Sequence, residues 1–321
     1  MRILMILIAA GVLIPMPLLS REYNVKSPDG RTVLSVETTG GVSVRVRYDN
    51  REIISGLTPE LQLGEVAFPG PEPALTRAVT SSVNEVLVPV VPRRNSRVPD
   101  VYNALTLRFR GGLAIDFRVY DDGVAYRFAT AMKDSVTVKN ERFGFSLPAG
   151  TKALYPLERG FMSHNECTFH PASMDTVGPK HLASLPALFT TEGTNIILTE
   201  ADIQDYPGLW ITGDGHGGVT GVLPAYPAAV KAHNDRNVYV TGREDYLAVT
   251  SGTRTYPWRL FIITPDDASL AESEMVYRLG APPAPGSDFS WVKPGKVAWD
   301  WYNANNIFGV DFRAGLNNDT Y

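Results

Sequence analysis

A short polar segment carries the highest density of groups that could do chemistry. It runs from Tyr155 to Pro171 with the sequence YPLERGFMSHNECTFHP. The candidate groups are Glu158, Arg159, His164, Asn165, Glu166, Cys167 and His170. Carboxylate and carboxamide oxygens suit calcium, which accepts oxygen ligands in flexible geometry. One cysteine with two histidines is a weaker match to the ligand spacing of a zinc site. An ordinary surface loop with solvated charges is the alternative to either metal site.

A second acidic segment, Thr199–Trp210, has the sequence TEADIQDYPGLW. A pair of carboxylates is the minimum equipment for hydrolysing a glycosidic bond, and this segment offers Glu200, Asp202 and Asp205. Three acids beside a Tyr-Pro-Gly turn are also typical of a solvated strand end, which is the interpretation we favour. The glycine-rich stretch around His216 is predicted to be a turn, because no helix follows it to hold a phosphate.

The elements that must position these groups are predicted to be strands. From about residue 23 to residue 265 apolar and polar residues alternate with a period of two, as antiparallel strands with one solvated face require. Examples of the apolar positions are Val42, Val44, Val46, Leu105, Leu107 and Phe109. Many short strands separated by turn signals predict a mainly β protein with an antiparallel β-sandwich. Prolines accumulate between residues 65 and 100, where we expect edge strands and loops.

One helix and a linker are predicted after the strands. Asp266 or Asp267 can cap a helix that ends at Leu279. The following Gly-Ala-Pro-Pro-Ala-Pro-Gly stretch is stiff, so residues 280–294 are predicted to be a linker. From about residue 290 the composition shifts to aromatic and carboxamide side chains, and we expect a new element to begin there that this chain does not complete.

The N-terminus has the charge pattern of a secretory signal peptide. Arg2 precedes an apolar run over residues 3–19, and polar residues follow it, so residues 1–20 are predicted to be the signal. A membrane anchor is the alternative, although Pro15 and Pro17 shorten any helix there. The net charge of −4 without basic blocks argues against nucleic acid as a partner. The single cysteine excludes an intramolecular disulfide.

Five motifs, in this order, carry a resemblance to a known family. They are SPDGR (27–31), YPLERGFMSHNECTF (155–169), TEADIQDYPGLW (199–210), YPWRLFIIT (256–264) and SWVKPGKVAWDWYNANNIFGVDFRAG (290–315). Together they resemble glycoside hydrolase family 97, from about residue 23 to the end of the chain. The last motif is the most specific of the five.

The resemblance implies an architecture and a metal. Members of this family are exported bacterial α-glycosidases, mostly α-glucosidases and α-galactosidases. They have an N-terminal β-super-sandwich, a central (β/α)8 barrel and a small C-terminal β domain. Their active site holds calcium, with one carboxylate ligand from the N-terminal domain, which by motif position is Glu166 here. On this basis residues 23–279 are expected to be the N-terminal domain and residues 295–321 the start of an incomplete barrel.

The terminal motif would then contribute to the substrate cleft. Lys296–Tyr302 resembles the first barrel strand, and Trp299, Trp301 and Asn303 become candidates to bind substrate. Alternatively, the two tryptophans fill the barrel interior. The wording of this motif is closer to the retaining, galactosidase-like branch of the family. The family's catalytic carboxylates lie beyond the end of this chain, so no catalytic residue is assigned and the chain alone is expected to be inactive.

The resulting functional prediction is an N-terminal fragment of an exported, calcium-dependent α-glycosidase. It would be periplasmic or secreted and would act on terminal α-linked sugars of oligosaccharides, together with the missing barrel of the same protein. No nucleic acid and no stable membrane association after signal removal are expected. The alternative from another class is a non-catalytic sugar-binding sandwich that uses its tryptophans as stacking platforms.

Overall fold

The computed structural model describes residues 22–91, 93–234 and 237–296. Its described residues form two compact units. The larger comprises residues 22–85 and 99–281, and the smaller comprises residues 86–98 and 282–296, with residue 92 left out. Residues 281–296 contain no helix or strand. The fold described below is that of the larger unit, with the strand ends that extend from it.

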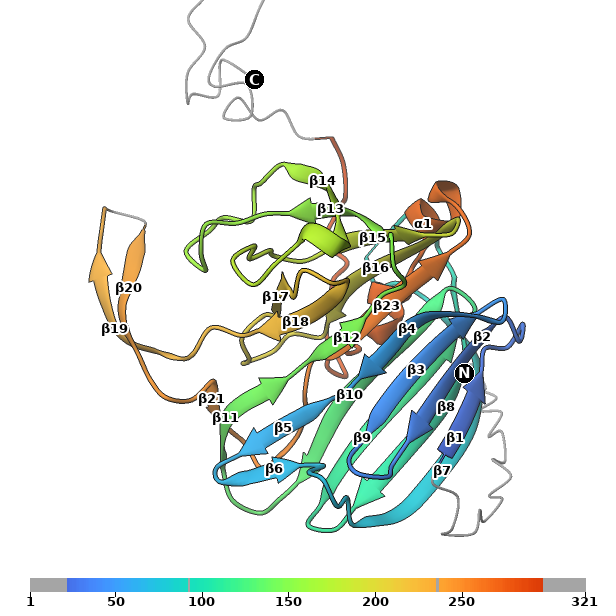
Figure 1. Cartoon of the computed structure of the whole chain (residues 1–321), viewed down its shortest axis with the longest axis horizontal. Coiled ribbons are helices and arrows are strands. Elements are labelled where there is room, and N and C mark those ends of the chain that lie inside the picture. Colours follow the sequence, from blue (N-terminus) through green and yellow to red (C-terminus); the bar gives the residue numbers. More distant parts are fainter. Residues whose placement is uncertain (1–21, 92, 235–236, 297–321) are drawn as a thin grey trace, which may run out of the picture. The chain divides into compact units, whose positions relative to one another are not determined.

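Two antiparallel sheets form the body of the fold (Figure 1). The first contains, in spatial order, β1 (Glu22–Lys26), β2 (Thr32–Glu37), β3 (Ser43–Tyr48), β4 (Arg51–Leu57), β12 (Gly144–Ser146), β18 (Gly218–Val222) and β17 (Trp210–Gly213). The second contains β14 (Phe169–Ser173), β13 (Lys152–Pro156), β15 (Ala187–Thr191), β16 (Thr194–Ala201), β23 (Trp258–Thr264), β10 (Gly123–Ala131), β9 (Leu113–Tyr120), β8 (Val98–Phe109) and β7 (Leu75–Leu87), and β22 (Thr253–Thr255) pairs with β10.

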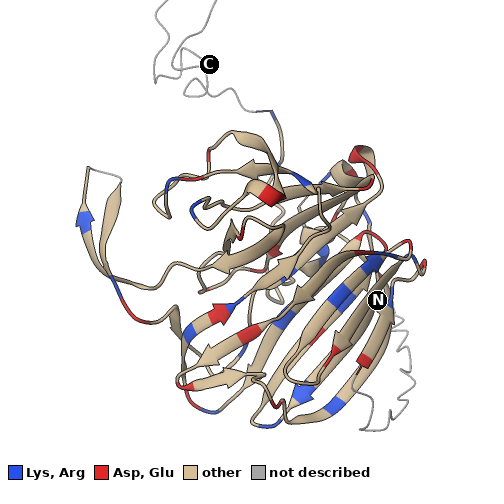
Figure 2. Cartoon of the chain, in the orientation of Figure 1, with Lys and Arg blue, Asp and Glu red and all other residues tan. Residues whose placement is uncertain are grey.

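Two smaller sheets complete the strand inventory of the described residues. One contains β21 (Ala248–Thr250), β11 (Val136–Arg142), β5 (Glu60–Leu63) and β6 (Val66–Phe68). The other is the hairpin of β19 (Pro227–Ala232) and β20 (Val238–Arg243). The predicted mainly β, antiparallel sandwich is therefore confirmed. Basic and acidic residues are interspersed along its strands (Figure 2).

The alternating pattern places the core between the two large sheets. Val44, Val46, Leu105 and Leu107 are all fully buried in one cluster that both sheets share. The arginines between them, such as Arg45, are exposed. This is the dry and wet alternation that the sequence predicts for strands with one solvated face.

A second core covers the outer face of the ten-stranded sheet. Every residue of β23 is buried. Its even-numbered side chains, Trp258, Leu260 and Ile262, pack with Met275 and Leu279 of a short helix. A strand that is buried on both faces needs an almost continuous apolar sequence, which explains the WRLFIIT segment.

The prediction of one continuous helix over 266–279 is wrong, because the structure has two short helices there. The structure has α1 (Asp267–Glu272) and α2 (Met275–Leu279), with a short 3-10 turn, η1 (Met174–Thr176), earlier in the chain. Asp266 is the N-cap, and its carboxylate accepts a hydrogen bond from the Ser269 amide at 2.7 Å. The break occurs at Ser273, whose hydroxyl donates to Asp122 Oδ2 at 2.7 Å and accepts from the Met275 amide at 3.3 Å. This tertiary contact competes with the helix.

The proline-rich region between residues 65 and 100 forms the expected edge. β6 ends the four-stranded sheet and β7 ends the ten-stranded sheet. Prolines lie outside both strands, as expected for residues that cannot donate to a ladder. Within the described ranges, no helix is long and apolar enough to cross a membrane.

Candidate functional site

The first acidic segment forms the loop between β13 and β14, and its first half is anchored to the sandwich. The Glu158 amide donates to the Leu182 carbonyl at 2.8 Å. The Glu158 carboxylate accepts a hydrogen bond from the Ser184 hydroxyl at 3.3 Å. Phe161 packs its ring edge-on against Trp210, with 5.3 Å between ring centroids. The loop therefore leaves the sheet in a fixed direction.

The second half of the loop presents Glu166 to solvent. The Asn165 backbone is left-handed, with φ 58°, and its amide donates to the Ser163 hydroxyl at 2.9 Å. The Glu166 side chain that follows this turn is exposed. Across the part of the chain that the structure describes, no side chain forms a hydrogen bond or an ion pair with its carboxylate. Glu166 is thus available as an oxygen ligand.

The remaining polar groups of the loop do not gather around a metal. Over the described residues, no group of three His, Cys, Asp or Glu side chains is arranged to hold an ion. Cys167 is half-buried, and burial together with the nearby Glu158 carboxylate raises the pKa of its thiol. A raised pKa leaves less thiolate, so this cysteine lacks the activation that a nucleophile needs.

The second acidic segment corrects the prediction of a solvated strand end. Glu200 is buried and forms an ion pair with Arg259. The other two Arg259 nitrogens donate to both carboxylate oxygens of Glu141, each at 2.8 Å. The second oxygen of Glu200 accepts the Leu209 amide at 3.0 Å. This buried triad of Arg259, Glu141 and Glu200 joins β23, β11 and β16, and it holds the end of the segment in place.

The other two acids of the segment lie in the turn beyond the triad. Asp202 and Asp205 both have left-handed backbones, with φ 59° and 48°. Asp202 is half-buried and accepts hydrogen bonds from Gln204 and from the Ala281 amide. Asp205 is exposed, as the prediction of a solvated turn required. These two acids border a cleft of about 980 Å³ that Tyr226, Arg243 and Arg254 also line.

Charge is unbalanced within the buried triad, which has two carboxylates and one guanidinium. Burial raises the pKa of Glu200 above its ordinary value of 4.5, although Arg259 opposes the shift. Burial by itself would lower the pKa of Arg259, but the charges of Glu141 and Glu200 outweigh it and raise that pKa. Arg259 therefore stays charged, and Glu200 takes up a proton at a higher pH than an ordinary glutamate does.

Replacing Glu200 by glutamine is expected to change how stability depends on pH. Because the pKa of Glu200 is raised in the folded state, its contribution to stability is largest below 4.5 and is lost as the pH rises through the folded value. The stability of Glu200→Gln relative to the natural chain should therefore improve as the pH rises. Urea unfolding midpoints measured from pH 4.5 to neutral check this, with the exposed Glu65→Gln as control. A difference that is constant with pH would contradict it.

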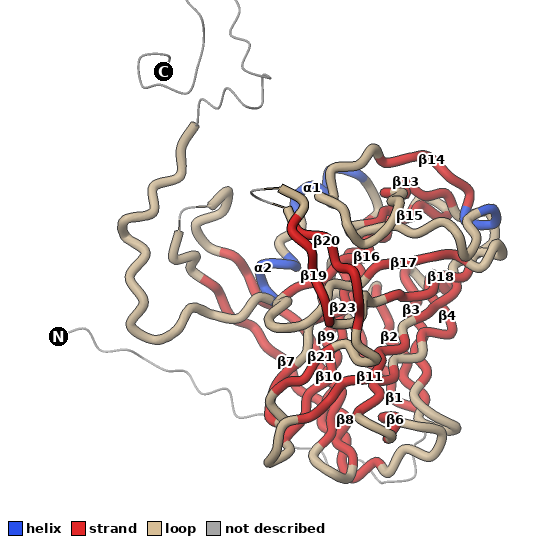
Figure 3. The backbone as a smooth tube through the Cα atoms, turned by 90° about the vertical axis from the view of Figure 1, so that its left-hand side faces the viewer, coloured by secondary structure: helices blue, strands red, loops and turns tan. Residues whose placement is uncertain are grey.

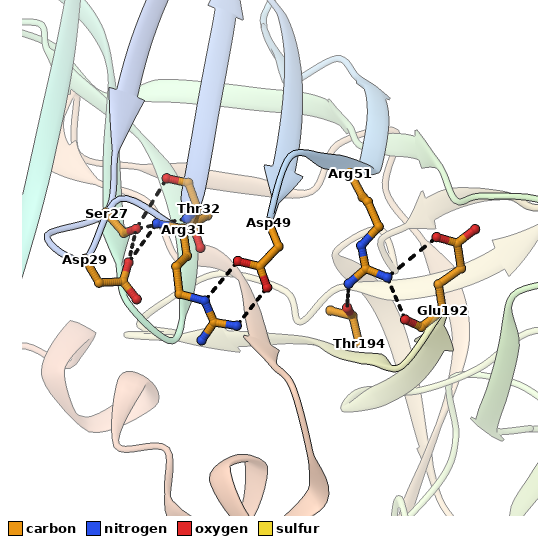
Figure 4. Close-up of polar contacts among 8 residues, drawn as sticks. All are labelled: Ser27, Asp29, Arg31, Thr32, Asp49, Arg51, Glu192 and Thr194. Carbon is orange, nitrogen blue, oxygen red and sulfur yellow. Dashed lines mark hydrogen bonds and ion pairs between the residues drawn. The ribbon is translucent and has the colours of Figure 1, made fainter.

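The motif SPDGR serves as a structural turn between β1 and β2 (Figure 4). The Ser27 hydroxyl donates to Asp29 at 2.6 Å, and the Thr32 amide donates back to the Ser27 oxygen at 3.0 Å. Arg31 makes a two-point ion pair with Asp49, at 3.0 and 2.8 Å. Over the described residues, none of these side chains forms a hydrogen bond with the loop of residues 155–171.

The glycine-rich stretch around His216 is the predicted turn. It connects β17 and β18, and the Asp214 carboxylate accepts the amides of His216 and Gly218 at 2.7 and 2.9 Å. The Asp214 carboxylate is occupied in closing the turn. No chemistry is assigned to it.

Trp299, Trp301 and Asn303 lie outside the described residues, as do the predicted signal peptide (1–20) and nearly all of the first barrel strand (296–302). Their predicted roles stay predictions. The sequence analysis did not identify Arg259 and Glu141 as members of a buried charge cluster. The signal that could have found them is a single arginine inside the otherwise apolar segment WRLFIIT, since a buried charge requires a buried partner.

The β-sandwich matches the N-terminal domain of a family of glycoside hydrolases. Residues 25–282 match the family model described as "Glycosyl-hydrolase 97 N-terminal". Because this match covers most of the chain, the chain belongs to glycoside hydrolase family 97.

Individual relatives agree with this assignment. A curated protein named "Retaining alpha-galactosidase", from Bacteroides thetaiotaomicron, is 32% identical over 318 residues, which covers 94% of this chain and 47% of that protein. A solved family 97 enzyme from Pseudoalteromonas sp. strain K8, in complex with acarbose, superposes with a TM-score of 0.74 at 20% identity. The match covers 93% of this chain and 44% of that one.

Another solved structure shares the fold with a lower TM-score. The crystal structure of a beta-arabinopyranosidase matches with a TM-score of 0.60 at 20% identity, over 76% of this chain and 40% of that chain. The chain thus spans less than half the length of each of these relatives. The structural neighbours establish the fold, and the family model establishes the family.

Proposed function

We propose that this chain is the N-terminal part of an exported α-glycosidase that removes terminal α-linked sugars from oligosaccharides. Family membership and the name of the curated relative support this proposal. That relative is called a retaining alpha-galactosidase, so α-galactosides are the favoured substrates and retention the favoured course. The observation in the chain itself that carries the proposal is the exposed Glu166 on a braced loop, where its carboxylate has no side-chain partner among the described residues.

In the proposed enzyme, Glu166 is a ligand of a calcium ion. The donor chemistry fits, because calcium binds carboxylate oxygens and accepts them in a flexible coordination geometry. Glu166 would supply one oxygen, and the remaining ligands would come from outside the described residues. When bound, calcium would supply positive charge that stabilises developing negative charge and orients the substrate. The role of the loop is to hold the carboxylate at a fixed place.

The proposal also includes export. The apolar run that follows Arg2 supports a signal peptide over residues 1–20, with the mature protein in the periplasm or secreted. The lack of a second cysteine is compatible with an exported protein whose large core provides its stability.

Substituting Glu166 by glutamine tests the calcium role in the protein extended to the length of its relatives. We expect kcat/KM for a nitrophenyl α-galactoside to fall about 10–100-fold or more, because neutralising a ligand weakens metal binding. The calcium concentration for half-maximal activity should rise in parallel. The exposed Glu65→Gln, on the turn between β5 and β6, is the matched control.

The outcomes of this experiment separate its two parts. Glu166→Gln with the activity and calcium response of the natural protein would overturn the calcium role. An extended protein that cleaves no α-glycoside would overturn the proposed function itself. The chain of 321 residues, assayed alongside, is expected to show no turnover.

A further inference from the structure

The β19–β20 hairpin stands away from the other sheets in the view of Figure 1, and in the view of Figure 3 it lies in front of them. Within the described residues it pairs with no other strand. All six residues of β19 are exposed, and so are most residues of β20. A two-stranded hairpin without a third strand or a covering layer is only marginally stable in water.

One face of this hairpin is entirely apolar. Val230 pairs with Val240, and Ala232 pairs with Val238, so these four side chains share a face. Lys231 and Tyr239 form the pair on the opposite face. Val230 is 58% exposed and Val238 is 50% exposed. We call the four residues Val230, Ala232, Val238 and Val240 the valine face.

The base of the hairpin is joined to the loop that carries Glu166. Arg243, the last residue of β20, donates a hydrogen bond to the Ala225 carbonyl at 2.5 Å. Its guanidinium lies over the Phe161 ring, 5.5 Å from the centroid. Phe161 packs in turn on Trp210. The hairpin and the acidic loop are therefore neighbours that share a contact.

We propose that the valine face docks against the part of the longer protein that lies outside this chain. This inference rests on the proposed function. The relatives are more than twice as long as the segment they share with this chain, so a partner surface of the necessary size exists in them. The largely exposed valine face lies on a segment that contacts the acidic loop through Arg243 and Phe161. That loop carries Glu166, whose carboxylate has no side-chain partner among the described residues. A single domain that packs against the hairpin would cover the valine face and would also lie beside Glu166.

Docking would also help to place Glu166. When the valine face is covered, the hairpin is held rigid, and Arg243 is held with it. The contact of Arg243 with Phe161 then restricts the acidic loop. The hairpin acts as a positioning element for the loop and contributes no group to the chemistry.

Hydrogen exchange provides the direct test. Backbone amides of residues 227–243 should exchange at least about tenfold more slowly in the extended protein than in the chain of 321 residues, because docking suppresses local opening. The double variant Val230→Lys with Val238→Lys should abolish this protection in the extended protein. It should leave the unfolding midpoint of the 321-residue chain unchanged, since both positions are exposed there. Val66→Lys, 61% exposed on β6, is the matched control.

Each outcome decides the question. Equal exchange rates in the two proteins would overturn the proposal. Protection in the 321-residue chain that grows with its concentration would assign the valine face to a second copy and would equally overturn it. Because exchange is measured without substrate, protection in an extended protein that lacks glycosidase activity would support docking while refuting the proposed function.

Discussion

Replacing Arg259 by methionine is expected to lower the free energy of unfolding by about 3–5 kcal/mol, because it leaves two buried carboxylates without a counter-charge. The side chains of Arg259 and Glu141 are each 1% exposed, and that of Glu200 is 7% exposed. Methionine retains much of the volume of arginine, so the loss reports charge more than packing. Urea unfolding followed by tryptophan fluorescence measures the change.

A surface arginine is the matched control for this substitution. The ion pair of Arg31 with Asp49 has the same two-point geometry, but both side chains are more than 40% exposed (Figure 4). Exposed pairs contribute little because water and salt screen them. Arg31→Met should therefore leave the unfolding midpoint nearly unchanged. An equal loss in the two variants would contradict the assignment of Arg259 as a buried structural charge.

The triad shows why sequence reasoning wrongly placed Glu200 at a solvated strand end. The sequence places Glu200 and Glu166 in similar settings, each in a polar segment after an apolar run. Their burial is decided by contacts that are distant in sequence, since Glu141 lies 118 residues from Arg259. A pattern with a period of two predicts which face of a strand is dry. It does not predict which charges from other strands will meet there.

The helix break has the same origin. The spacing of apolar residues between 266 and 279 fits one helix, and the cap at Asp266 was predictable because capping is local. The interruption at Ser273 depends on Asp122, which lies 151 residues away. Alternation in β3 and β8 was also predictable, since it needs only local pattern and a common core. Local rules therefore gave the strands and the cap, and tertiary contacts decided the remainder.

Substitutions of Glu200 and Glu166 are expected to affect different properties of the protein. Glu200 is fully engaged by Arg259 and by the Leu209 amide, so its removal should act through the fold. Glu166 has no side-chain partner among the described residues, so its removal should cost the fold little. A substitution of each to glutamine, compared in unfolding and in activity, should therefore give opposite orders of effect. The stability part of this contrast follows from burial and partners, and the activity part follows from the calcium role proposed for Glu166.

Truncating Phe261 to alanine is expected to cost about 3–5 kcal/mol of unfolding free energy through loss of buried surface and the cavity that remains. Phe261 is 1% exposed and lies on β23 between its neighbours β16 and β10. Its ring meets Phe145 edge-on at 5.1 Å and stacks with Phe143 at 6.2 Å. Those two phenylalanines flank or lie on β12 in the opposite sheet, so the contact joins the two layers. Urea unfolding of Phe261→Ala and Phe261→Leu measures it.

The leucine variant separates cavity formation from loss of the aromatic ring. Leucine retains most of the apolar volume, so Phe261→Leu should lose clearly less stability than Phe261→Ala. Val249→Ala, at a position that is 58% exposed on β21, should change stability little and serves as the control. Phe261 and Arg259 project from the same face of β23, two residues apart, into the space between the sheets. A loss in Phe261→Ala no larger than that of the control would therefore contradict both the packing of the sandwich and the buried setting of the triad.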